Sequence, residues 1–222
     1  MGKVGYLRVQ LDAREGADIE AFQKWRVDAF ANIPGATSKL ILTATDAPEE
    51  GKPYRSENAY DLSDVDAVNL QHLAAAWKKT SAPMVSSMDL LLYERLNFSS
   101  HQNIVALPPK DTVVVANSLT PENDPAVIQD YHDWYEQEHI HKLMAIPGYR
   151  LGGRYKLIGC VGSNLEYTGP FLAVHQYDKE NGLGGTEWTK SIKSDWTMKI
   201  DQRMVKRPHR RVFQVDDAYV LT

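Results

Sequence analysis

The sequence predicts an α+β fold in which two βαββαβ repeats pack their antiparallel sheets face to face, as an intramolecular α+β barrel. Two observations support this prediction. Strand and helix patterns follow the same order in both halves of the 222 residues, and short segments recur in that order. The recurring segments are FQKW (22–25) and YHDW (131–134), IPG (33–35 and 146–148), and YD (60–61 and 177–178).

The first half contains four apolar or β-branched segments typical of strands, at residues 4–11, 37–45, 58–62 and 88–96. Two segments with helical spacing lie among them, at residues 18–31 and 64–79. Pro34 and Gly35 end the first helix, because the residue before a proline is pushed out of the helical region. Ser63 is placed to cap the second helix.

The second half repeats this course. Its predicted strands lie at residues 111–118, 149–158, 170–178 and 210–215. Asp124 and Pro125 form a helix start, as a capping residue followed by a first-turn proline, and the helix continues to about Ala145. A further helix is predicted near residues 186–198.

The βαββαβ order is that of the ferredoxin-like unit, whose four-stranded sheet carries helices on one face only. The bare faces of two such sheets can cover each other, and a small ligand could fit between them. We therefore expect a first repeat at residues 1–99, a linker at 100–110 and a second repeat at 111–222.

Composition argues against several classes of function. A net charge of −4 and a pI near 6.0 give no reason to expect nucleic acid or an anionic membrane as partner. No segment approaches 18 consecutive apolar residues, and no signal peptide is evident. Cys160 is the single cysteine, so an internal disulfide or thiolate cluster is impossible. We expect a cytoplasmic protein, either a monomer that mimics a dimer or a homodimer, that acts on a small molecule.

The two halves differ after the shared tryptophan. Nine positions separate Trp25 from Pro34, whereas thirteen separate Trp134 from Pro147. The added four residues amount to about one helical turn. They fall in the segment EQEHIHK, so the second half alone carries these histidines, and the asymmetry points to a site there.

At about 100° per residue, one face of this helix is predicted to meet the sheet, and it carries Ile128, Tyr131, Tyr135, His139, Leu143 and Ile146. His139 is the candidate general acid/base, because imidazole exchanges protons near neutral pH. Tyr135 and Tyr131 are candidates to orient it or to polarise a carbonyl. The alternative is a structural histidine bonded to a backbone carbonyl.

The same helix carries a set of candidate metal ligands. His132, Glu136 and His139 share a stripe, and two imidazoles with a carboxylate suit zinc or iron. On a straight helix the first and last lie about 10 Å apart, too far for one ion. His139 and His141, two residues apart, do not face each other. We expect no metal.

The next strand alternates tyrosine and leucine with Arg150, Arg154 and Lys156. We expect this basic row to line the barrel lumen, with Arg154 holding a substrate carboxylate or phenolate. The alternative is an ion pair from Arg154 to Glu136 or Glu138. His175 alternates with apolar residues on a later strand and is a second candidate for the lumen.

The segment DWYEQEHIHKLMAIPGYRLGGRY resembles the EthD-like branch of the dimeric α+β barrel superfamily. The residues that match its pattern are Trp134, Tyr135, Glu138, His139, Pro147, Gly148, Arg154 and Tyr155. The resemblance implies a small, usually cofactor-free enzyme with histidine and tyrosine in acid–base roles, and it adds Trp134 and Tyr155 as substrate-binding candidates. The first half lacks the histidine and the Arg-Tyr pair, so it resembles a degenerate copy with a structural role.

We therefore expect a cofactor-independent lyase, cyclase or isomerase of secondary or aromatic metabolism, acting on a hydrophobic aromatic or polyketide-like molecule. His139, Tyr135 and Tyr131 would be catalytic, and Arg154, His175, Tyr155 and Trp134 would bind substrate. Two alternatives stay open. One is a haem-binding or cofactor-free oxygenase-type barrel, with His139 or His175 as axial ligand where haem binds. The other is a non-catalytic binding or stress-response module.

Overall fold

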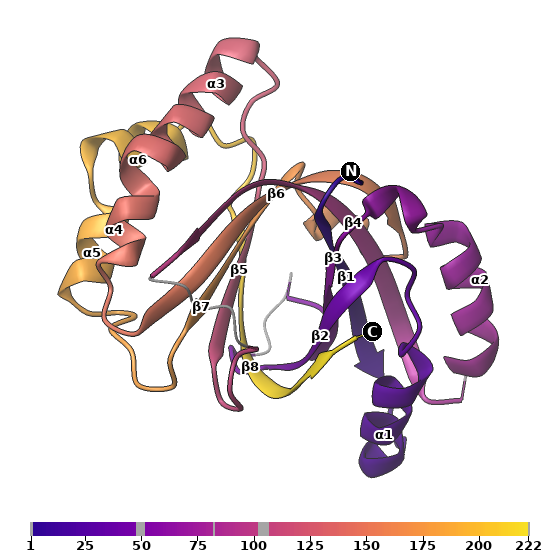
Figure 1. The fold of residues 1–222 in the computed structure, drawn as a ribbon. Helices are drawn as coiled ribbons and strands as arrows, with labels where there is room; N and C mark the ends of the chain where they lie inside the picture. Colours follow the sequence, from indigo (N-terminus) through magenta and orange to yellow (C-terminus); the bar gives the residue numbers. More distant parts are fainter. Residues whose placement is uncertain (1, 48–51, 82, 102–106, 222) are drawn as a thin grey trace.

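A computed structural model describes residues 2–47, 52–81, 83–101 and 107–221. Within these residues, eight antiparallel strands close into a barrel in the order β1-β3-β2-β8-β5-β7-β6-β4 (Figure 1). The helices lie outside, with α1 and α2 on one side of the barrel and α3 to α6 on the other. This confirms the predicted fold class. No helix in the described part of the chain is both long and apolar enough to cross a membrane.

The first half supplies one side of the barrel. Its elements are β1 (Gly5–Ala13), α1 (Ile19–Ala29), β2 (Ala36–Ala44), β3 (Ser56–Leu62), η1 (Val65–Ala67), α2 (Leu70–Ser81) and β4 (Val85–Ser100). The strands pair in the order β4-β1-β3-β2. The Asp18 carboxylate caps α1 by accepting from two backbone N–H groups.

The second half repeats the arrangement. Its elements are β5 (Val113–Leu119), α3 (Pro125–Trp134), η2 (Tyr135–His139), α4 (Ile140–Met144), β6 (Tyr149–Val161), η3 (Leu165–Tyr167), β7 (Phe171–Tyr177), α5 (Thr186–Ile192), α6 (Asp195–Asp201) and β8 (His209–Val220). The strands pair in the order β6-β7-β5-β8, and the β2–β8 and β4–β6 pairs join the two sheets. Asp124 caps α3 and Pro125 occupies its first turn, as predicted.

Three sequence-based details are corrected. Ser63 does not cap a helix, because its hydroxyl donates to the Gly35 carbonyl, while Asp64 caps the short 3-10 turn that precedes α2. The helix predicted near residues 186–198 is two helices, since Ser194 caps a new start at Asp195. In the predicted linker, β4 extends to Ser100, and residues 102–106 lie outside the described residues.

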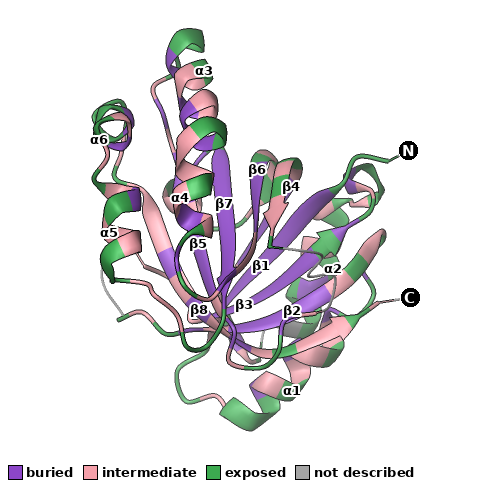
Figure 2. Cartoon of the chain, turned by 60° about the vertical axis from the view of Figure 1, so that its left-hand side comes forward, coloured by how far each residue is buried: buried purple, intermediate pink, exposed green. Residues whose placement is uncertain are grey.

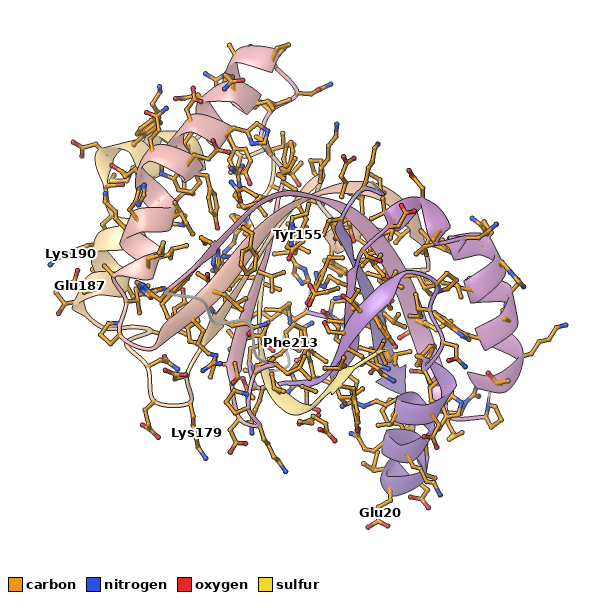
Figure 3. All side chains as sticks on the ribbon, in the orientation of Figure 1. Glu20, Tyr155, Lys179, Glu187, Lys190 and Phe213 are labelled. Carbon is orange, nitrogen blue, oxygen red and sulfur yellow. The ribbon has the colours of Figure 1, made fainter. Side chains whose placement is uncertain are left out.

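Apolar side chains form one layer inside the barrel and one beneath each helical side. The strands of the barrel are accordingly largely buried (Figure 2). The inner layer includes Tyr155 and Phe213, which Figure 3 places between the two sheets. The barrel also buries charge. Arg8 donates to Glu57 from Nε at 2.8 Å and from Nη2 at 2.6 Å, and Gln10 donates to the same carboxylate at 3.1 Å. Both faces of the strands are therefore buried.

Candidate functional site

The helix that carries the predicted catalytic residues contains a π-helical segment, η2, between α3 and α4. The Ile140 N–H donates to the Tyr135 carbonyl five residues earlier. This wider turn stacks the rings of Trp134 and His139, whose centroids lie 4.2 Å apart. π-turns are frequent at functional sites, and this one lies in the segment by which the second half is longer.

The π-turn moves His139 off the predicted face. Tyr131 and Tyr135 meet the sheet and are 0% and 2% exposed, as the helical spacing predicts. His139 lies instead between Trp134 and the backbone of Ser191 in α5, because 100° spacing does not hold through a π-turn. Trp134 faces the same way, and its indole N–H donates to the Thr197 hydroxyl at 3.1 Å.

Arg154 and His175 point out of the barrel toward the helix, so the prediction that they line the lumen is wrong. His175 shares its side of β7 with Phe171 and Tyr177, which pack against the tyrosines of the helix. Tyr155, the neighbour of Arg154, faces the lumen. Alternation along a strand separates two faces but does not identify the inner one when both are buried. Tyr155 is thus separated from the other candidates by the sheet.

Arg154 forms the polar centre of the helix–sheet interface. Its guanidinium carbon lies 4.3 Å from the ring centroid of Tyr135 and 5.0 Å from that of Tyr131. Its Nη2 lies 2.6 Å from Nδ1 of His132, and its Nη1 lies 3.5 Å from the carboxylate of exposed Glu136. The alternative of an ion pair to Glu136 is confirmed. His132, which the sequence offered only as a candidate metal ligand, is half-buried and contacts Arg154.

Tyr135 and His175 form a buried hydrogen-bonded pair across the interface. The Tyr135 hydroxyl contacts Nε2 of His175, and the two rings are nearly parallel, at 9°. Gly152 on β6 makes room for this pair, because a Cβ there would collide with Nδ1 of His175 and with the Tyr149 hydroxyl. The sequence singled out each member of the pair but did not predict that they contact each other.

Burial sets the protonation states of these groups. Loss of solvent lowers the pKa of His175 to about 3, and the neighbouring His139 and Arg154 lower it further. Burial likewise lowers the pKa of His139 to about 3, against an opposing contact with the Ser191 backbone. Burial raises the pKa of the Tyr135 hydroxyl well above its usual value, while Arg154 opposes that rise. At neutral pH the pair is therefore a neutral imidazole and a neutral phenol.

Several buried polar atoms around this pair have no hydrogen-bond partner among the described residues. They are the Tyr131 hydroxyl, Nε of Arg154, and Nδ1 of both His139 and His175, while Nη1 of Arg154 has only the 3.5 Å ion-pair contact with Glu136. An unsatisfied buried polar group costs about 1–3 kcal/mol, so such groups are normally satisfied by water or a ligand. Their gathering between the helix and strands β6 and β7 makes this interface the candidate site. We name Tyr131, Tyr135, Arg154 and His175 the tyrosine–histidine cluster.

Neither candidate histidine suits an axial haem ligand. Nε2 of His175 is taken by Tyr135, and its Nδ1 lies against Gly152. One face of the His139 ring stacks on Trp134, and the side chain contacts the Ser191 backbone. Within the described residues, no three His, Cys, Asp or Glu side chains gather as metal ligands would. We therefore place no step of chemistry on haem or metal.

The two buried histidines should make stability depend on pH. Because their folded pKa values lie near 3, below the unfolded value of about 6.5, their contribution is complete above pH 6.5 and is lost as pH falls toward 3. We expect His139→Gln to flatten the dependence of unfolding free energy on pH between pH 7 and 5, measured by urea unfolding. His72→Gln, at an exposed position on α2, is the control and should leave the slope unchanged.

The closed barrel with its outer helices is the dimeric α+β barrel fold, formed here within one chain. An anthrone oxidase-like protein matches 100% of this chain and 94% of its own length with a TM-score of 0.65 at 13% identity. A candidate monooxygenase from Fusobacterium nucleatum matches 99% of this chain and 95% of its own, with a TM-score of 0.62 at 8% identity. A candidate chlorite dismutase matches 98% and 96%, with a TM-score of 0.56 at 14% identity.

At these identities the likeness establishes the fold alone. The chain matches no protein-family model and no curated protein. The function therefore has to be argued from the tyrosine–histidine cluster.

Proposed function

We propose that the protein is a cofactor-independent enzyme that moves protons on a small hydrophobic molecule, of aromatic or polyketide-like type, in a lyase or cyclase reaction. The observation that supports this most is the buried contact between Tyr135 and His175, surrounded by unpartnered polar atoms. Buried, coupled acid–base groups of this kind concentrate at active sites. Decarboxylation, dehydration and cyclisation through an enolate all require such proton transfers and no oxidant.

In this proposal the substrate oxygen binds where Arg154 and Tyr131 present unpartnered donors. When a C–H bond beside the carbonyl breaks, its electron pair moves onto that oxygen as an enolate. The guanidinium and the phenol stabilise the new charge in a site that excludes water. The proton passes to the Tyr135–His175 pair. Developing negative charge nearby raises the pKa of the imidazole, which favours transfer at that moment.

The proposal revises the role of one residue. The sequence alone favours His139 as general acid/base, whereas the contacts favour His175. The Tyr135 hydroxyl hydrogen-bonds Nε2 of His175, while His139 meets Tyr135 only ring edge to ring face, at 5.1 Å between centroids, and stacks on Trp134. We further propose that the chain belongs to the EthD-like branch, because Tyr135, His139 and Arg154 occupy the pattern's positions on the helix and the following strand. The fold shared with an anthrone oxidase-like protein is compatible with this assignment.

The test is deuterium exchange, which reports proton abstraction even when the natural reaction is unknown. The full chain is incubated in D₂O with aromatic ketones that carry an acidic methylene group, anthrone among them, and exchange is followed by NMR. We expect exchange well above the buffer rate, a fall of about 100-fold or more in His175→Gln, and nearly full activity in His139→Gln.

Other outcomes contradict specific parts of the proposal. If His139→Gln loses exchange while His175→Gln retains it, His139 is the acid–base residue, as the sequence suggested. If the unaltered protein exchanges no ketone in the panel while one binds beside the cluster, detected by chemical-shift changes, the protein is a binding module rather than an enzyme.

A further inference from the structure

The barrel lumen contains a second site of different character. At one end it opens into a cavity of about 700 Å³, within the usual range for small-molecule sites. Its floor is a pair of stacked tyrosines, Tyr6 and Tyr155, whose ring centroids lie 5.0 Å apart at 26°. Leu40 and Val174 add apolar walls. The cavity shares strands β6 and β7 with the tyrosine–histidine cluster but lies on the opposite side of the sheet.

Large apolar side chains surround the mouth of this cavity. Val4, Phe98 and Val220 line it and are 38%, 49% and 69% exposed, respectively. They come from three different parts of the chain, the segment before β1, the end of β4 and the end of β8, yet meet at one opening. A gathering of exposed apolar groups at the rim of a cavity is typical of a ligand site.

Two charged groups give the cavity its polarity. Arg95 projects from β4 with its guanidinium 5.6 Å from the centroid of the Phe98 ring, and none of the ion pairs among the described residues includes it. Asp61 on β3 lies opposite Tyr6 in the strand register and accepts from the Ser38 hydroxyl at 2.6 Å. Arg95 acts on the Asp61 carboxyl through its charge, which opposes the rise that burial gives the pKa of Asp61. The Arg95 side chain is exposed and lines the cavity, so an incoming anion can reach its guanidinium.

We propose that the lumen cavity binds a planar, largely apolar molecule with one acidic group, such as an aromatic carboxylate. Its ring would pack against Tyr6 and Tyr155, and its anionic oxygens would pair with Arg95 in the fork geometry that a guanidinium offers. This inference does not depend on the chemistry proposed for the helix–sheet interface.

The test is calorimetric titration of the full chain with 2-naphthoate and with its neutral counterpart, 2-naphthamide. We expect one site per chain and tighter binding of the carboxylate by about tenfold, as for a charge-assisted hydrogen bond worth about 1.4 kcal/mol more. Arg95→Gln should abolish the preference for the carboxylate. Arg207→Gln, at an exposed position outside the cavity, is the matched control.

Leu40→Trp, which fills the cavity, should abolish binding of both ligands, with circular dichroism confirming the fold. Equal affinity for acid and amide, no binding of either ligand, or a preference that survives Arg95→Gln would overturn the inference. His175→Gln should leave both affinities unchanged. If His175→Gln abolishes binding instead, the ligand occupies the tyrosine–histidine cluster and the lumen site is refuted.

Discussion

Replacing Tyr135 by phenylalanine is expected to lower ketone-dependent deuterium exchange by about 10²- to 10⁴-fold, the usual contribution of a positioned acid–base group. The substitution removes one oxygen atom and leaves the ring in place over Arg154, 4.3 Å from the guanidinium carbon. It also leaves His175 without its partner at Nε2. The fold should persist because the apolar packing around the ring is unchanged.

Tyr149→Phe is the matched control for this experiment. Tyr149 is also buried and lies near His175, with ring centroids 6.0 Å apart, but its hydroxyl pairs with Ser99 at 2.8 Å rather than with the imidazole. We expect it to retain exchange within a few fold. Equal losses in the two variants would show that buried hydroxyls matter here for structure alone. Full activity in Tyr135→Phe would remove the pair from the mechanism.

The pH dependence of the deuterium-exchange rate distinguishes a chemical role of the Tyr135–His175 pair from a role in packing alone. His175 stays neutral down to about pH 3, so exchange by the unaltered enzyme should be level from pH 5 to 8. A sigmoidal rise in rate with its midpoint near pH 6.5 would indicate an unperturbed imidazole acting as the base. It would therefore point to a histidine outside the buried cluster.

The barrel was predictable because several independent sequence patterns indicate the same fold. Two repeated units are indicated by strand alternation, by the proline–glycine helix ends and by the repeated order of elements. The bare face of each sheet must be buried, and the closed barrel of β1 to β8 confirms that the two sheets bury each other. The length difference after Trp134 falls on the segment that forms the π-turn between α3 and α4. Such signals are local, and the fold is largely set by local patterns and their repetition.

The site was less predictable because its geometry depends on the direction in which each side chain leaves its helix or strand. A period of 100° per residue places His139 on the sheet-facing side with Tyr135. The π-turn between Tyr135 and Ile140 turns His139 onto Trp134 and toward α5, so it keeps only an edge contact with the Tyr135 ring.

On β7, alternation grouped the residues of each face correctly. On β6 it placed Tyr149 on the same face as Tyr155, whereas the irregularity between Tyr149 and Leu151 turns Tyr149 toward the helix. On both strands it did not say which face is inside. The prediction therefore placed Arg154 and His175 in the barrel lumen, whereas both face the helix.

Glu57→Gln is expected to cost about 3–5 kcal/mol of unfolding free energy, because it leaves the buried charge of Arg8 without its counter-ion. Glu57 is 1% exposed and Arg8 is 3% exposed, deep in the barrel. Burial by itself would lower the pKa of Arg8, but Glu57 raises it, so the arginine stays charged. Urea unfolding at pH 7 measures the loss.

Two further variants test whether the loss of stability comes from an unpaired buried charge. Glu94→Gln breaks the surface pair to Lys3, 3.6 Å apart and 35–59% exposed, and should cost no more than about 1 kcal/mol. The double variant Arg8→Met/Glu57→Leu removes both buried charges and should recover most of the stability, since apolar replacements of buried ion pairs are often neutral. Recovery would show that the pair is dispensable for stability. Equal losses of unfolding free energy in Glu57→Gln and Glu94→Gln would contradict this explanation, because only Glu57→Gln leaves a buried cation without its counter-ion.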